Sequence, residues 1–303
     1  MSTLISRALT ITKLGDPRKN KIEGAYPGSE SPKIGGSEAV GIVEKAGSSS
    51  TFQPGDSVIP IGMGGDLWSE YDVVEDENLI KIRSDIDLIS AATLLINPPT
   101  AYVMLKHFVE LNPGDYIIQN SANSGVGRAV IEIAHAWGYK SINLIRDRPN
   151  VDELKEDLKN IGANFVFTEE EFRKENRKIS AEYDIKLALN GVGGRSALAI
   201  SAVLAPGGTI VTYGGMSKKP AEIPTSAFVF KGIRAFGVAV GKWMCIEENR
   251  PLDLILQGKL HPPPVETHDL ENFHAAIDQT LEGKNRKQVL LIHPDYKKYI
   301  AKL

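Results

Sequence analysis

The sequence predicts an α/β protein in which a doubly wound parallel sheet is joined to a smaller β-rich domain. Three observations predict this fold class. An apolar strand, a turn of small residues and an amphipathic helix follow one another over residues 116–137. Strand-like runs and helical patterns then alternate as far as residue 238. From residue 28 to 83, by contrast, short runs alternate with turn residues and no helical period is present.

The composition is that of a globular protein with room for two cores. The chain has 303 residues, of which 42% are hydrophobic and 24% charged. A net charge of −3 provides no basic field for nucleic acid, and no stretch approaches the ~20 consecutive apolar residues of a membrane span. We therefore expect a small soluble ligand, with neither nucleic acid nor membrane as partner.

Cysteine and histidine usage gives no indication of a metal site. The single cysteine, Cys245, excludes an intramolecular disulfide and any zinc site built from several cysteines. The six histidines are scattered and form no His-x-x-x-His pair. His135 is expected to be a packed or surface residue, so no metal is predicted.

The first part of the chain predicts a compact β domain. Strand-like runs occur at Glu38–Glu44, Gln53–Pro60 and Trp68–Val74, and the many glycines between them suit sharp corners and bulges. The extreme N-terminus lacks acidic residues, as transit peptides do, but residues 7–12 equally suit a first strand, and both interpretations stay open.

Two helices are expected to lead into the doubly wound domain. The alanine-rich run Leu88–Leu95 reads as a helix, residues 97–102 are expected to break it, and a second helix should end at Val109. A helix at Val151–Ile161 and a parallel sheet with right-handed crossovers follow. The strands of that sheet are expected at residues 116–119, 141–145, 164–167, 185–189, 209–213 and 233–238. A helix at 270–281 and a strand at 288–292 end the pattern.

The turn after residue 119 predicts a dinucleotide-binding site. Pyrophosphate must approach the backbone and the free N–H groups of the next helix, which large side chains would block. The three positions of the Gly-x-Gly-x-x-Gly pattern fall on Ala122, Ser124 and Gly127, with one more glycine at Gly125. Because only the third glycine is kept, an ordinary strand, turn and helix without a ligand is the alternative.

Two arginines follow the next strand, where the adenosine ribose of a bound dinucleotide would lie. An enzyme that selects NAD places an acidic side chain there, whereas one that selects NADP offers arginine to the 2′-phosphate. Arg146 and Arg148 flank Asp147 and are interpreted as a phosphate clamp, against the alternative of solvated charges before a helix. The loops at residues 190–194 and 213–216 lie at the same carboxyl edge of the predicted sheet, where ligands bind.

Several motifs together resemble those of one protein family. The chain is similar to the medium-chain dehydrogenase/reductase superfamily, in its zinc-free, quinone-oxidoreductase-like branch, and within it to the mitochondrial trans-2-enoyl-thioester reductases. The motifs that carry the resemblance are Gly15-Asp-Pro17, Gly24-Ala-Tyr-Pro27, Gly35-Gly-Ser-Glu38, Pro54-Gly-Asp56, Asn97-Pro98, Gln119-Asn-Ser-Ala-Asn-Ser-Gly-Val-Gly127, Arg146-Asp-Arg-Pro149 and Tyr213-Gly-Gly-Met216.

The resemblance implies a fold, a cofactor and an activity. A GroES-like β-barrel catalytic domain would comprise residues 1–98 and 262–303, and a Rossmann NADPH-binding domain residues 99–261. The implied activity is NADPH-dependent reduction of trans-2-enoyl thioesters of coenzyme A or acyl carrier protein in mitochondrial fatty acid synthesis. A homodimer is expected to form through the edge strand at residues 234–238.

The resemblance also implies site residues. Tyr26, of the Gly-x-Tyr-Pro motif, would be the catalytic acid, although from the residues alone it reads as a half-buried aromatic at a turn. The expected cofactor contacts are Asn97, Asn123, Ser124, Gly125, Val126, Arg146, Asp147, Arg148, Tyr213, Gly214, Gly215, Met216, Phe236, Gly237, Val238, Ala239 and Lys287.

The sequence departs from the family pattern in two places. Family members carry several tens of residues, including two barrel strands, where Asn20 here runs almost directly into Lys21, and a shorter piece is missing near residues 248–254. Either the form is naturally shortened, or segments have been left out of the sequence. Two rival functions stay open: an NADPH quinone oxidoreductase that uses no acid at Tyr26, and a non-enzymatic NADPH-binding protein.

Overall fold

The computed structural model describes residues 35–36, 38–61, 67–243, 251–282 and 286–293. The chain divides into two compact units. The first combines Met1–Leu95 with Pro262–Leu303, and the second is Ile96–His261.

The second unit is built on a six-stranded sheet in which all neighbouring strands are parallel. The strand order is β6-β5-β4-β7-β8-β9, so the direction of winding reverses between β4 and β7, and ligands bind at such a switch point in doubly wound sheets. The predicted doubly wound fold is confirmed. The strands are β4 (Tyr116–Gln119), β5 (Lys140–Ile145), β6 (Phe165–Thr168), β7 (Ile185–Asn190), β8 (Thr209–Thr212) and β9 (Arg234–Gly237).

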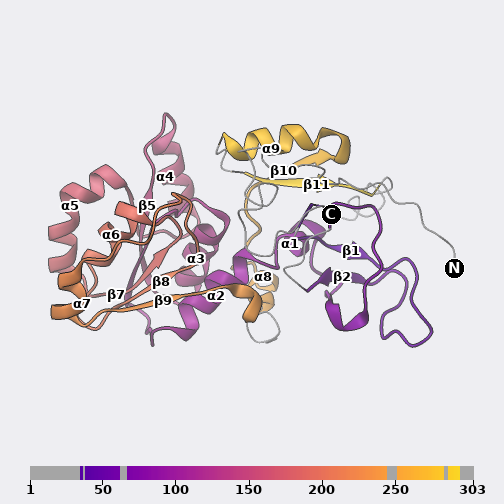
Figure 1. The fold of residues 1–303 in the computed structure, drawn as a ribbon, viewed down its shortest axis with the longest axis horizontal. Coiled ribbons are helices and arrows are strands. Elements are labelled where there is room, and N and C mark those ends of the chain that lie inside the picture. The colour runs from indigo at the N-terminus through magenta and orange to yellow at the C-terminus, as the bar shows by residue number, and fades with distance from the viewer. Residues whose placement is uncertain (1–34, 37, 62–66, 244–250, 283–285, 294–303) are drawn as a thin grey trace. The chain divides into compact units, whose positions relative to one another are not determined.

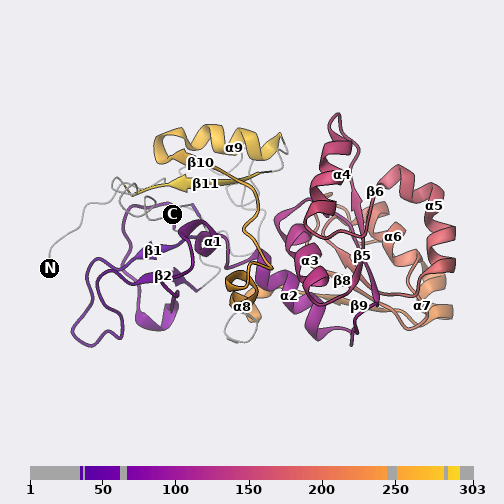
Figure 2. The ribbon, with the colours of Figure 1, turned by 180° about the vertical axis from the view of Figure 1, so that it is seen from behind.

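Helices cover both faces of this sheet (Figures 1 and 2). Successive side chains of a strand point to opposite faces, so Ile117 packs with α2 and α3, whereas Ile118 packs with α5, α6 and α7. Helix α4 packs beside α3 over β5 and β6. The helices of this unit are α2 (Asn97–His107), α3 (Gly125–Ala136), α4 (Val151–Asn160), α5 (Glu169–Glu182), α6 (Gly194–Ala202), α7 (Thr225–Lys231), α8 (Leu252–Leu256) and the 3-10 turn η2 (Val240–Lys242).

The predicted break at residues 97–102 is wrong, because these residues form the start of α2. Pro98 and Pro99 occupy the first turn of the helix. Proline is tolerated there, since the N–H groups of the first turn have no partner within the helix and the fixed φ of proline suits it. The second helix begins at Asn97 as a result, and it ends at His107 rather than Val109.

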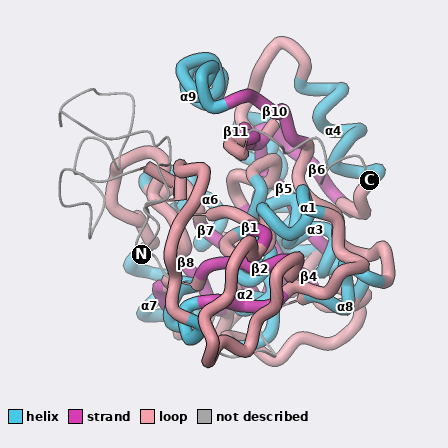
Figure 3. Tube along the Cα trace, turned by 90° about the vertical axis from the view of Figure 1, so that its right-hand side faces the viewer, coloured by secondary structure: helices cyan, strands magenta, loops and turns pink. Residues whose placement is uncertain are grey.

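The first unit contains two small sheets. Strands β1 (Gly41–Ile42), β2 (Ser57–Pro60) and β3 (Leu79–Lys81) form an antiparallel sheet in that order. Strands β10 (Val265–Asp269) and β11 (Lys287–Leu291) pair in parallel, and α9 (Phe273–Leu281) lies against them (Figure 3). The short helices of this unit are η1 (Asp76–Asn78), α1 (Leu88–Ala92) and η4 (Leu270–Asn272).

The strand predicted at residues 68–74 does not form, and only Ser69 makes a β-bridge. Val73 is 93% exposed, whereas the half-buried residues Trp68, Tyr71 and Val74 are three apart rather than two, so the run lacks the alternation of a strand. The Trp68 side chain instead lies on the backbone of Gly35, where an added Cβ would be 2.4 Å from its ring. Strand propensity reflects packing on a half-buried surface, so a run without such a surface stays irregular.

Candidate cofactor site

The turn between β4 and α3 brings backbone atoms very close together. The Ser124 hydroxyl caps α3 by accepting a hydrogen bond from the Gly127 N–H at 3.1 Å. A Cβ on Gly127 would lie 2.5 Å from the carbonyl oxygens of Ser121 and Ala122, so a side chain cannot fit. The start of α3 therefore offers bare backbone and unpaired N–H groups at the carboxyl edge of β4, which is the arrangement that a pyrophosphate needs.

Asn97 lies against this turn. A Cβ on Gly125 would be 2.4 Å from the Asn97 side-chain nitrogen, so the amide of α2 touches the first residue of α3. Asn123, Ser124 and Gly125 are half-buried and Val126 is buried. The structure thus brings together five of the expected cofactor residues, with a polar amide beside the first residue of α3.

Two guanidinium groups follow β5, the strand next to β4. Burial lowers the pKa of Arg148, and the positive charge of Arg146 lowers it further. The Asp147 carboxylate accepts a hydrogen bond from the Arg148 N–H at 2.9 Å. The arginines supply the charge suited to a phosphate, and the cofactor contact of Asp147 stays a prediction.

The loop after β8 places the Tyr213 hydroxyl next to the turn. Burial raises the pKa of Tyr213 to about 12, and the nearby Ser124 hydroxyl opposes this shift. The Tyr213 hydroxyl is buried and has no partner in hydrogen-bond geometry within the described structure. Met216 is 77% exposed, and its N–H donates to the Gly191 carbonyl at 3.1 Å. An unsatisfied buried hydroxyl at the carboxyl edge fits a group that binds a polar ligand.

The expected contacts at residues 236–239 lie at the same edge. Phe236 and Gly237 end β9, and the Val238 N–H extends the ladder to the Thr212 carbonyl at 3.0 Å. The Phe236 ring lies 5.6 Å from the Phe108 ring, between centroids. These residues therefore flank the loop after β8, although Phe236 itself also packs on α2.

Two of the expected site residues do not belong to the second unit. Lys287 lies on β11 of the first unit and forms an ion pair with Glu38. Tyr26 lies outside the described residues. The roles of both stay predictions.

Sequence reasoning missed a pair of buried asparagines. Asn120 and Asn190 lie at the carboxyl ends of β4 and β7, are fully buried, and are joined by a hydrogen bond of 2.9 Å. Asn190 directly follows an apolar strand residue, whereas Asn120 follows Gln119 at the end of a short apolar run, and a polar residue at that point of two adjacent strands is the signal that could have revealed them.

Other classes of site find little support in the described ranges. Among these residues, no group of three or more His, Cys, Asp or Glu could hold a metal ion, and no helix is long and apolar enough to cross a membrane. His135 is exposed on α3.

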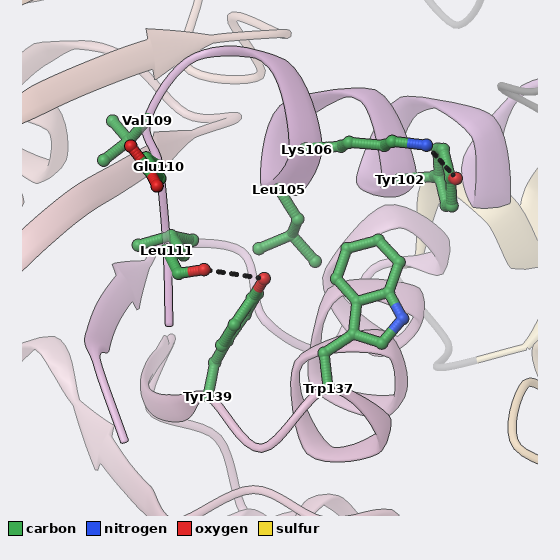
Figure 4. Close-up of a pocket in the computed structure, with 8 residues that line it drawn as sticks. All are labelled: Tyr102, Leu105, Lys106, Val109, Glu110, Leu111, Trp137 and Tyr139. Carbon is green, nitrogen blue, oxygen red and sulfur yellow. Dashed lines mark hydrogen bonds between the residues drawn. The ribbon is translucent and has the colours of Figure 1, made fainter. Parts of the chain in front are cut away.

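A separate pocket lies at the amino ends of the parallel strands, and Figure 4 shows the residues that line it. Its volume is about 350 Å³, and its walls come from the last turns of α2 and from the segments that precede β4 and β5. The Tyr139 hydroxyl donates to the Leu111 carbonyl there at 3.3 Å. Since dinucleotides bind at the carboxyl ends of such strands and this pocket is at their amino ends, it is not the cofactor site.

Comparison with known proteins identifies the family. The mitochondrial enoyl-acyl-carrier-protein reductase of Caenorhabditis elegans is 51% identical over 288 residues, which cover 90% of this chain and 83% of that protein. The chain belongs to this family of mitochondrial enoyl reductases. A family model described as zinc-binding dehydrogenase also matches residues 125–255.

Solved structures agree with this assignment. The Etr1p/NADP/crotonyl-CoA complex has a TM-score of 0.79 and 29% identity, and the match covers 94% of this chain and 89% of that one. The mitochondrial 2-enoyl thioester reductase Etr1p/Etr2p heterodimer of Candida tropicalis has a TM-score of 0.76 and 30% identity, covering 92% of this chain and 88% of that one. The resemblance to the medium-chain enoyl-thioester reductases and the predicted fold class are confirmed.

Proposed function

We propose that this chain reduces trans-2-enoyl thioesters to saturated acyl thioesters with NADPH, in mitochondrial fatty acid synthesis. The observation that carries this function is the arginine pair beside the bare N-terminus of α3, in a chain 51% identical to a mitochondrial enoyl reductase over most of its length. The substrate is an enoyl-CoA or an enoyl-acyl carrier protein. The enzyme is an oxidoreductase of mitochondria, as its relatives' names indicate.

The chain's own residues bind and orient the cofactor. NADPH supplies the hydride that adds to the β-carbon of the enoyl thioester. The N–H groups at the start of α3 and the residues from Asn123 to Val126 hold the pyrophosphate, while Arg146 and Arg148 hold the 2′-phosphate. The loops after β8 and β9, at Tyr213–Met216 and Phe236–Ala239, form the wall beside them. Residues 99–261 act as the NADPH-binding domain.

The other chain segments supply the catalytic domain. Tyr26 gives a proton to the α-carbon, or a hydrogen bond to the enolate oxygen, as negative charge gathers on the thioester. Asn97 and Lys287 complete the cofactor contacts. Residues 1–98 with 262–303 form this domain. It contains the antiparallel β1-β2-β3 sheet and the β10-β11 pair, whereas Tyr26 itself lies outside the described residues.

The enzyme acts as a homodimer. Strand β9 is an edge of the sheet and all four of its residues are exposed, so its backbone is open to pairing with a second copy. Helix α7, which leads into β9, exposes apolar side chains: Phe228 by 43%, Val229 by 65% and Phe230 by 84%. An edge strand beside such a patch supports an interface that includes both elements.

One assay separates the proposed function from its rivals. NADPH oxidation is measured with crotonyl-CoA, with longer enoyl thioesters and with a quinone. Turnover of the thioesters is expected, with the quinone a poor substrate. Turnover of quinone alone would replace the proposal with a quinone oxidoreductase, and NADPH binding without turnover of either would favour a non-enzymatic protein.

A further inference from the structure

Two buried asparagine side chains join the central strands of the sheet at their carboxyl ends. Asn120 follows the last residue of β4, Asn190 ends β7, and both are 0% exposed. A buried amide is costly unless its polar atoms are bonded, so an amide pair here requires a complete set of partners. The sheet's switch point lies between these two strands.

Asn190 is the centre of this network. Its Oδ1 accepts hydrogen bonds from the Asn120 side chain at 2.9 Å, from the Gly193 N–H at 3.0 Å and from the Val192 N–H at 3.2 Å. Its Nδ2 donates to the Thr212 hydroxyl at 3.1 Å. Because backbone N–H groups can only donate, the oxygen of Asn190 must be the atom that faces them.

Asn120 holds the same loop from the other side. Its Oδ1 accepts from the Gly191 N–H at 2.8 Å, and its Nδ2 also contacts the Ser196 hydroxyl at 3.1 Å. The backbone N–H groups of three successive loop residues, Gly191, Val192 and Gly193, are therefore bound by two side-chain oxygens. Such a loop has one defined conformation.

The loop in turn supports the segment that carries Tyr213. The Gly191 and Val192 carbonyls accept hydrogen bonds from the Met216 and Ser217 N–H groups at 3.1 and 3.0 Å. A Cβ on Gly191 would lie 2.6 Å from the Tyr213 hydroxyl oxygen, so the ring rests directly on this glycine. The asparagine pair is thus linked by contacts to the Tyr213 hydroxyl beside Ser124.

We propose that Asn190, held by Asn120 and by the Thr212 hydroxyl, is a positioning residue that sets the loop after β7 and the Tyr213 segment for cofactor binding. This inference rests on the proposed function. Loss of the network would let the two loops adopt other conformations, and the apparent cofactor affinity would fall with the fraction that stays competent. A small displacement of the bound cofactor would also slow hydride transfer.

The sharpest test changes Thr212 rather than an asparagine. Asn190→Ala would leave several buried donors without a partner and would destabilise the fold for that reason alone. Thr212→Val keeps the size and shape of the side chain and removes one hydroxyl from the edge of the network. The matched control is Thr209→Val on the same strand, because the Thr209 hydroxyl is buried and has no hydrogen-bond partner in the described structure.

The readouts are the Kd for NADPH by fluorescence titration without substrate, kcat and KM with crotonyl-CoA, and the Tm. Thr212→Val should raise the Kd about fivefold to tenfold and lower kcat/KM at least as much, since one buried hydrogen bond is lost. Thr212→Ser, which restores the hydroxyl, should recover most of the affinity. Thr209→Val should bind NADPH as the wild type does.

The outcomes separate this proposal from the proposed function. A lower Tm for Thr212→Val with a Kd and kcat/KM equal to those of Thr209→Val would make the network purely structural and overturn the inference. A wild type that binds NADPH but does not turn over enoyl thioesters would overturn the proposed function, while the Kd values would still decide the role of Asn190. A wild type that binds no NADPH would overturn both.

Discussion

At the scale of single residues, Arg146 and Arg148 bring two like charges together at the end of β5. Burial and the charge of Arg146 both lower the pKa of Arg148, so the cationic form of the folded protein carries an electrostatic penalty. A bound phosphate would oppose this shift, so the two arginines are candidate phosphate ligands.

Arg146→Ala should reduce the preference for NADPH over NADH. Loss of a charge-assisted phosphate contact costs about 1.5 to 3 kcal/mol, or about ten- to a hundredfold in NADPH affinity, with NADH little changed. Fluorescence titration with both cofactors measures this, and Arg177→Ala, an exposed arginine on α5, is the control. Equal weakening for both cofactors would place the arginines away from the ribose phosphate.

Tyr26→Phe should lower the turnover of enoyl thioesters by ~10² to 10³-fold, the usual range for a general acid or an oxyanion donor. NADPH binding should stay near the wild-type value, because the hydroxyl acts only in the transition state. Steady-state kinetics with crotonyl-CoA and a quinone, together with cofactor titration, test this. Full enoyl reductase activity in the variant would mean that the tyrosine only packs.

At the scale of elements, α7 and β9 follow each other along the chain at one end of the sheet, and each carries exposed residues. Phe230 on α7 is 84% exposed and β9 has no strand on its outer side within the described structure. Open edges with apolar neighbours promote association unless they are covered. Strand β9, the last strand of the sheet, is therefore the element most suited to pair with a second copy of the chain.

A homodimer is expected at micromolar concentration, and Phe230→Lys should weaken it. A charge placed in the apolar patch would lose its hydration if the patch were buried against a second copy. Light scattering of the wild type and the variant measures the mass, with Lys174→Ala on exposed α5 as the control. A monomeric wild type, or a variant dimer of unchanged affinity, would rule out this interface.

At the scale of the whole molecule, the last residue of the second unit, His261, contacts the buried carboxylate of Glu132. Glu132 on α3 is 7% exposed, and it binds the N–H and the Nδ1 of His261, the last residue of that unit, at 3.1 and 2.9 Å. Burial raises the pKa of Glu132, although His261 and Arg128 oppose the shift.

The pKa of Asp115 shifts in the opposite direction. Burial would raise it, but the hydrogen bonds from Lys186 and from the Asn112 N–H outweigh burial and lower it.

The raised pKa of Glu132 predicts a pH dependence of stability. The unfolded chain ionises Glu132 near pH 4.5, while the folded chain keeps the proton to a higher pH, so the folded state binds more protons in between. Stability should therefore fall as pH rises through this window, relative to Glu132→Gln, which cannot ionise. Tm values of both proteins from pH 4 upward measure the difference. A gap that stays constant with pH would contradict the assignment.

The sequence by itself determined the doubly wound half of the protein. Both ends of β4 and the start of β7 were predicted correctly, because buried parallel strands are short apolar runs bounded by turn residues. The small residues before α3 and the arginines after β5 predict a cofactor site for a similar reason, since backbone approach and phosphate charge both require particular residue types. Each of these signals is carried by neighbours along the chain.

Only the tertiary structure decided which polar groups meet. Asn120 and Asn190 lie 70 residues apart, and Glu132 and His261 lie 129 apart, so no local pattern could pair them. The absence of a strand at residues 68–74 likewise reflects where Trp68 packs against Gly35, which the local pattern does not show. The spacing of apolar residues along the sequence indicates which side of a helix or strand is buried. Buried side-chain hydrogen bonds, by contrast, depend on which strands become neighbours in the folded sheet.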